Sequence, residues 1–158
     1  MRGGPRPKLA PTWPPGLRLQ FQVSVRPTVR AHKTSPDGKE RDLELDAYQS
    51  EVVANGPDAA RSREVVYGAW LARQFDNLGG ARLIVATLAG WQLAPVYRKG
   101  QAVAGSTHAR RGTRLMTLPE AAFAGELEVT DGPAFHALLA RGIGRHRAFG
   151  HGMVLVRR

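Results

Sequence analysis

The chain has 158 residues, with 23 Lys and Arg against 13 Asp and Glu, so its formal net charge is +10 at neutral pH. This length suits one ordinary domain, and 42% hydrophobic residues are enough for a core. The lack of cysteine excludes disulfides, thiolate catalysis and Cys-ligated metal clusters, and no apolar run approaches the roughly 18 residues of a membrane helix. We expect a soluble, cytoplasmic protein that needs no cofactor or metal, avoids membranes and binds a polyanion.

The first half of the chain predicts an arm, a strand and a helix. Residues 1–16 are rich in proline and arginine and predict a flexible arm ahead of a single domain over residues 17–158. Leu17 to Arg26 alternates apolar and polar residues, which indicates a half-buried strand. The polar stretch that follows is weakly patterned, with a short helix suggested over Leu43–Val53. Apolar residues at three- and four-residue spacing predict a helix from Asp58 or Ser62 to Leu78.

The second half predicts further strand segments and a helix. A β-prone run extends from Arg82 to Tyr97, and its all-apolar Leu83–Val85 predicts burial on both faces. A strand over Thr113–Leu118 is expected to pair with the preceding strand, and alternating apolar and polar residues over Phe123–Val129 indicate a further strand segment. A helix capped by Asp131 and ended by Gly142 and a strand over Phe149–Val156 complete the expected elements.

In chain order these elements read β, α, β, β, α, β. That order is typical of the ferredoxin-like α+β fold, in which a four-stranded antiparallel sheet carries two helices on one face. A basic β-hairpin extends the sheet in this prediction, and the second sheet face stays open for a ligand.

The excess positive charge lies in two acid-free segments. The first contains Arg98, Lys99, Arg110, Arg111 and Arg114, and the second contains Arg141, Arg145, Arg147, Arg157 and Arg158. The other 13 basic residues balance the 13 acids. Arginine outnumbers lysine nine to one in these segments, which favours bidentate phosphate or base contacts. We favour nucleic acid as the partner, although charge alone does not separate it from anionic lipid.

The second segment is also rich in glycine. Gly142, Gly144, Gly150 and Gly152 flank a tip formed by Arg145, His146 and Arg147. Glycines let the backbone turn tightly and approach a ligand, and exposed peptide N–H groups can bind an anion. The segment follows a helix and precedes a strand, so it matches neither the Walker loop nor the dinucleotide-binding loop.

These residues carry a resemblance to a known family. Gly142-Ile143-Gly144, five residues, and Gly150-His151-Gly152 resemble the C-terminal glycine-rich signature of the RAMP superfamily, with Leu138–Arg141 and Arg147–Phe149 similar to CasE-type CRISPR RNA-processing endoribonucleases. His151 departs from the pattern, since that position is usually apolar. The similarity is collinear over residues 14–158 and corresponds to the second of the family's two ferredoxin-like domains.

The resemblance implies binding of a CRISPR repeat RNA hairpin and metal-independent cleavage of precursor crRNA. By this resemblance the loop is formed by Gly142, Gly144, Gly150 and Gly152. Its RNA contacts are Arg145, His146 and Arg147. Arg98, Lys99, Arg110, Arg111 and Arg114 correspond to the basic hairpin. The family's catalytic histidine belongs to the first domain, so no residue here inherits that role. We expect a separate N-terminal half or other subunits of a CRISPR effector complex as partners.

The chain's own residues leave alternatives open. RNA cleavage without metal needs a base, an acid and a cation, and His146 between two arginines is the best local catalytic candidate, followed by His108. A zinc site from His146 and His151 is rejected because nearby arginines repel a cation. Trp13, Trp91, Tyr97 and Phe149 could stack bases, although Trp91 and Phe149 suit a core. The competing hypotheses are a non-catalytic RNA-binding module of the RRM type and an enzyme for a phosphorylated metabolite.

Overall fold

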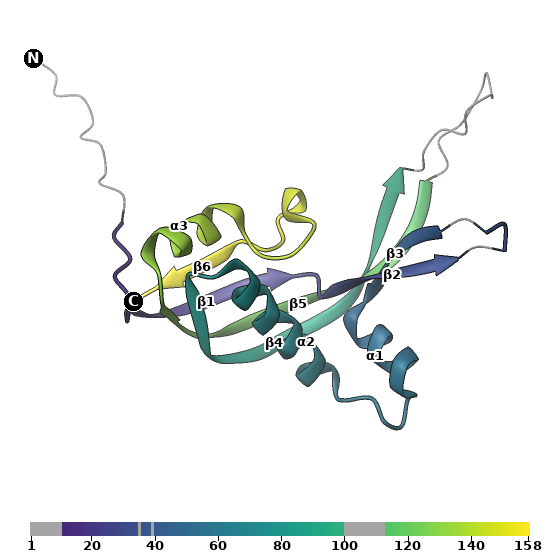
Figure 1. Cartoon of the computed structure of the whole chain (residues 1–158), viewed down its shortest axis with the longest axis horizontal. Coiled ribbons are helices and arrows are strands. Elements are labelled where there is room, and N and C mark those ends of the chain that lie inside the picture. The colour runs from purple at the N-terminus through teal and green to yellow at the C-terminus, as the bar shows by residue number, and fades with distance from the viewer. Residues whose placement is uncertain (1–10, 35, 39, 100–112) are drawn as a thin grey trace, which may run out of the picture.

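The computed structural model describes residues 11–34, 36–38, 40–99 and 113–158, and Figure 1 shows its elements. They are, in chain order, β1 (Arg18–Val25), β2 (Thr28–Thr34), β3 (Glu40–Asp46), α1 (Ala47–Asn55), α2 (Arg63–Leu78), β4 (Ala81–Lys99), β5 (Thr113–Val129), α3 (Gly132–Arg141), a 3₁₀ turn (Arg147–Phe149) and β6 (Val154–Arg157). None of the helices in these ranges is long and apolar enough to cross a membrane.

The predicted ferredoxin-like order is confirmed. The main sheet has the strand order β4-β5-β1-β6, every neighbouring pair is antiparallel, and α2 and α3 lie on one face (Figure 1). When β2, β3 and α1 are set aside, the remaining elements follow the expected βαββαβ order. The core lies between the sheet and the two helices, with Phe21 of β1 against Phe75 of α2 at 5.8 Å between ring centroids.

Local signals in the sequence explain the regular elements. In β1 every second side chain is buried, as its alternation predicts. Ser62 caps α2 by accepting a hydrogen bond from the Val65 N–H, and Asp131 caps α3 through the Ala134 N–H. Gly142 ends α3 by donating its N–H to the Leu138 carbonyl. These caps define where α2 begins and where α3 begins and ends.

The weakly patterned stretch after β1 forms regular secondary structure. It forms the two-stranded β2–β3 hairpin and then α1, all inserted between the first strand and the first core helix of the fold. The suggested helix over Leu43–Val53 is therefore wrong in its first half, because Leu43–Asp46 belongs to β3. The hairpin stands away from the main sheet and is mostly exposed, so its alternation between apolar and polar residues is faint.

Three other strand predictions need correction. Leu83–Val85 is not buried on both faces: Val85 is 52% exposed, because it lies with Gln20 and Gln22 on the sheet face that the helices leave uncovered, and a β-bulge interrupts the register of β4 there. The two segments expected around Pro119 form one continuous strand, β5. The last strand begins at Val154 rather than Phe149, since residues 147–149 form the 3₁₀ turn.

Candidate nucleic-acid interface

The glycine-rich segment, residues 142–152, is a loop closed at its base. The Ile143 N–H donates to the Gly152 carbonyl at 2.8 Å, and the Gly152 N–H donates to the Ser24 carbonyl of β1 at 2.6 Å. Ile143 is fully buried, so the start of the loop is attached to the core. Residues 144–151 therefore extend from a base that is fixed to both α3 and β1.

Three of the four predicted loop glycines, Gly142, Gly144 and Gly152, have no room for a side chain. A Cβ on Gly152 would lie 2.1 Å from the Ile143 carbonyl oxygen, and one on Gly144 would lie 2.9 Å from Cη2 of Trp70. Both residues also have positive φ, at +83° and +72°, a region that favours glycine. The glycine spacing seen in the sequence thus produces the closed base and its close packing on α2.

The three side chains at the loop tip have different partners. His146 lies in the left-handed region at φ +62° and its Nε2 is 2.8 Å from Oε1 of Glu44 in β3. Nη1 of Arg145 lies 3.8 Å from the same oxygen. Arg147 instead donates from Nη1 to the Arg141 carbonyl at 3.0 Å, at the end of α3. Arg145 and His146 are therefore brought together at one acid, whereas Arg147 turns back toward its own helix.

Glu44 is a site residue that the sequence analysis missed. Its side chain is only 9% exposed, and Oε1 accepts a hydrogen bond from the Thr28 hydroxyl at 2.7 Å in addition to contacting His146. Burial raises the pKa of Glu44, but the hydrogen bonds with Thr28 and His146 and the nearby positive charges outweigh it and leave the pKa below its ordinary value. Glu44 and His146 are 102 residues apart, so no local pattern relates them.

These residues line a cavity of about 610 Å³ between three parts of the chain. Its walls come from β3, from the outer parts of β4 and β5, and from the glycine-rich segment, and they comprise Glu44, Val96, Tyr97, Met116, Leu118, Arg145, His146 and Phe149. Phe149 is 77% exposed and Tyr97 is 72% exposed. The expectation that Phe149 belongs to the core is therefore wrong.

The other candidate stacking residues are engaged within the protein. Trp13 packs edge-on against Phe135 of α3, with 5.3 Å between ring centroids. Trp91 is 48% exposed, so the expectation that it belongs to the core is also wrong. Its ring lies 4.0 Å from the Arg63 guanidinium. Among the four aromatic candidates, only Tyr97 and Phe149 line this cavity.

The predicted basic hairpin is the outer part of β4 and β5, which we call the β4–β5 arm and define as residues 90–99 and 113–122. Its register pairs Arg98 with Arg114 and Lys99 with Thr113, so two cationic residues are neighbours across the ladder. Arg110, Arg111 and His108 lie outside the described residues. The arm contributes Val96, Tyr97, Met116 and Leu118 to the cavity, so these residues line the same cavity as Arg145, His146 and Phe149 of the glycine-rich segment.

A second polar cluster holds the end of the loop. Buried Arg26 donates from Nη2 to Oε1 of Glu120 at 2.7 Å, and Nε2 of His151 lies 3.5 Å from that oxygen. Burial lowers the pKa of His151, and the charge of Arg26 lowers it further. His146 and His151 thus contact different carboxylates, and within the described ranges no group of three metal-ligating side chains is found.

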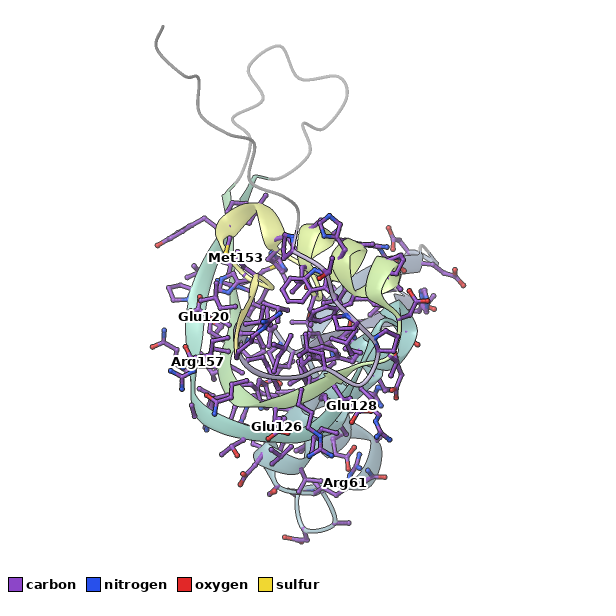
Figure 2. The ribbon with its side chains drawn as sticks, turned by 90° about the vertical axis from the view of Figure 1, so that its left-hand side faces the viewer. Arg61, Glu120, Glu126, Glu128, Met153 and Arg157 are labelled. Atoms are coloured by element: carbon purple, nitrogen blue, oxygen red, sulfur yellow. The ribbon has the colours of Figure 1, made fainter. Side chains whose placement is uncertain are left out.

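The open face of the main sheet differs from an aromatic base-stacking platform. Its central strands β1 and β5 present Gln20, Gln22, Ser24, Ala122, Ala124 and Glu126 there, since the alternate residues are the buried ones. Figure 2 shows Glu126 and Glu128 on β5, and Arg18 forms ion pairs with both. No aromatic side chain occupies these six described positions, which disfavours the RRM-type mode of binding.

Comparison with known proteins identifies the family. Residues 5–158 match the family described as CRISPR associated protein, and the chain belongs to that family. A search of curated proteins found no significant match. The family assignment agrees with the resemblance carried by the glycine-rich segment, which lies within the matched residues.

Several solved structures share the fold. They include CRISPR endoribonuclease Cse3 bound to a 19-nucleotide RNA, with 24% identity, a TM-score of 0.61, and coverage of 98% of this chain and 62% of that one. Thermus thermophilus Cse3 bound to an RNA representing a pre-cleavage complex has 25% identity, a TM-score of 0.53, and coverage of 95% and 58%. Cas6e from Escherichia coli has 18% identity, a TM-score of 0.57, and coverage of 94% and 64%. The chain therefore spans less than two thirds of each of these proteins.

Proposed function

We propose that this chain binds the stem-loop of a CRISPR repeat RNA and takes part in processing precursor crRNA in the cytoplasm. The observation that carries the proposal is the meeting of the glycine-rich segment and the basic β4–β5 arm around one cavity. Membership of a CRISPR associated family and similarity to Cse3 structures that contain RNA support the same substrate.

In this proposal the two basic segments contact phosphates on either side of the cavity. Gly142, Gly144, Gly150 and Gly152 shape the loop backbone, and Arg145, His146 and Arg147 contact RNA from its tip. Arg98, Lys99, Arg110, Arg111 and Arg114 contact the stem from the arm. Guanidinium groups suit phosphate oxygens because they donate two parallel hydrogen bonds.

The first test is the salt dependence of RNA binding. We expect a repeat hairpin to bind more tightly than a scrambled hairpin, with log K falling against log salt with a slope of about −4 to −5 if about five phosphates are engaged. An Arg98→Ser/Arg114→Ser variant should lose about two units of that slope. Arg18→Ser is the control, since Arg18 pairs with Glu126 and Glu128 on the open sheet face. Equal, salt-insensitive binding of both hairpins would contradict the proposal.

We further propose His146 as the candidate general base for cleavage. In this reaction the base removes the proton of a 2′-hydroxyl, the 2′-oxygen attacks the adjacent phosphorus, and the bond from phosphorus to the 5′-oxygen breaks as that oxygen takes a proton from water. The contact with Glu44 supports the role, because a tautomer that donates from Nε2 to the carboxylate keeps Nδ1 able to accept a proton. Arg145 could stabilise the phosphorane charge.

The test of this second proposal is cleavage of the repeat hairpin in EDTA. We expect His146→Ala to abolish cleavage and His136→Ala, on the exposed side of α3, to retain it. Unchanged cleavage by His146→Ala removes His146 from the mechanism. Binding without cleavage by the wild-type chain would indicate that a separate N-terminal half, or another subunit of a CRISPR effector complex, supplies the catalytic histidine.

A further inference from the structure

The cavity beside the glycine-rich segment combines features that a phosphate site lacks. Its two aromatic side chains, Tyr97 and Phe149, are largely exposed and belong to different segments of the chain. Its wall also contains the nearly buried carboxylate of Glu44, which lies beside Arg145 and His146. From this combination we propose that the cavity binds one unpaired nucleobase that carries an exocyclic amino group. This inference rests on the proposed RNA-binding function and adds a subsite to it.

Phe149 is held in a position where it can stack on a base. The 3₁₀ turn that carries it is closed by the Phe149 N–H to the His146 carbonyl at 2.9 Å and by the Gly150 N–H to the Arg147 carbonyl at 3.2 Å. The ring lies 6.3 Å from the His146 ring between centroids, and most of its surface faces solvent. A large apolar ring fixed in an exposed position by backbone hydrogen bonds is typical of a base-stacking platform.

Glu44 provides the polar contact that selects a base over a phosphate. The hydrogen bonds with Thr28 and His146 converge on Oε1, Nη1 of Arg145 lies 3.8 Å from the same oxygen, and among the described residues no hydrogen bond to Oε2 is found. A free carboxylate oxygen repels phosphate and accepts hydrogen bonds from amino groups. Adenine, cytosine and guanine each carry such an amino group, whereas uracil presents carbonyl oxygens in its place.

Arg145 makes the subsite compatible with the rest of an RNA strand. Its side chain lines the cavity, with the guanidinium 3.8 Å from Oε1 of Glu44, and is partly exposed. It can therefore contact the phosphate attached to the bound nucleotide while the base enters between Tyr97 and Phe149. The charge of Arg145 also offsets the repulsion between Glu44 and the RNA backbone.

The experiment measures binding to one fixed G·C-rich hairpin with a blunt end or with a four-nucleotide 5′ tail of A, C or U. Fluorescence anisotropy with a dye on the loop gives the dissociation constants, and the hexamers rA6 and rU6 are titrated in parallel. We expect A and C tails to improve binding about tenfold over the blunt hairpin, and the U tail to improve it much less. We also expect rA6 to bind better than rU6.

Variants separate stacking from amino-group recognition. Phe149→Ala should remove the gain from every tail, whereas Glu44→Gln should reduce the difference between A and U tails. Phe149→Leu keeps the apolar bulk without the aromatic ring, and Leu155→Ala, an exposed residue of β6 outside this cavity, is the unaffected control. Phe149 is largely exposed, so its variants test the subsite even if Glu44→Gln fails to fold.

The outcomes distinguish the two proposals. Tight blunt-hairpin binding without any gain from a tail overturns the nucleobase subsite and leaves stem binding intact. Absence of hairpin binding overturns the proposed function, and the subsite is then supported if rA6 exceeds rU6 and is overturned if the two hexamers bind equally. A gain from the tail that persists in Phe149→Ala also overturns the subsite.

Discussion

Gly152 and Gly150 offer a matched test of how the loop base is held together. Both have positive φ, at +83° and +85°, but a Cβ on Gly152 would lie 2.1 Å from the Ile143 carbonyl oxygen. A Cβ on Gly150 would meet no described atom within 4 Å. Gly150→Ala therefore carries only the left-handed backbone cost, about 1–2 kcal/mol.

Gly152→Ala should cost considerably more stability. Relieving the overlap moves the backbone that accepts from Ile143 and donates to Ser24, so two hydrogen bonds of about 0.5–1.5 kcal/mol each are weakened as well. Together with the backbone cost, we expect about 2–5 kcal/mol of lost unfolding free energy. Urea denaturation followed by tryptophan fluorescence measures both variants. Equal destabilisation by Gly150→Ala and Gly152→Ala would refute the argument that crowding, rather than backbone conformation, requires Gly152.

Two further predictions concern buried charges. Asp46→Ala leaves the guanidinium of Arg63, which lies 2.7 Å from the Asp46 carboxylate, without its buried partner, and should lower stability by about 3–5 kcal/mol in urea denaturation. Arg61→Ala, which removes an exposed ion pair, should leave the midpoint nearly unchanged, and similar losses in both variants would contradict this reasoning. Acidification should destabilise the protein through His151: its folded pKa lies below the ordinary 6.5, so the unfolded chain takes up the proton first as pH falls. The stability that neutral His151 contributes is present above about pH 6.5 and is lost as pH falls through the folded pKa. His151→Gln should therefore lose less stability than wild type between pH 7.5 and 5. Thermal unfolding at both pH values measures this difference, and identical losses in the two proteins would disprove the role of His151.

Much of the fold could be predicted because its signals are local. The alternation in β1, the Ser62 cap of α2 and the Asp131 cap of α3 each involve residues within a few positions of one another. The glycine spacing of residues 142–152 was equally visible, and the structure gives it a physical reason in the crowding at Gly144 and Gly152. Periodicity and capping depend on neighbouring residues, so they can be recognised without knowing the fold.

The β2–β3 hairpin and the exposure of β4 could not be predicted in this way. Few side chains of the hairpin are buried, so few of its positions need to be apolar and its alternation is faint. The apolar run Leu83–Val85 is partly exposed because one face of the sheet carries no helix, and which face the helices cover is a property of the whole domain. An apolar run by itself does not reveal whether one face or both faces of a strand are covered.

The sequence alone determined the βαββαβ order, the end of α2, both ends of α3 and the acid-free basic segments, since periodicity, capping and charge are properties of neighbouring residues. Only the tertiary structure decided which polar groups meet. His146 and Glu44 come together because β3 stands beside the glycine-rich segment, and Phe149 faces the cavity because a 3₁₀ turn replaces the start of the expected strand. Contacts across 102 residues depend on the register and direction of several elements together, which no short stretch of the chain encodes.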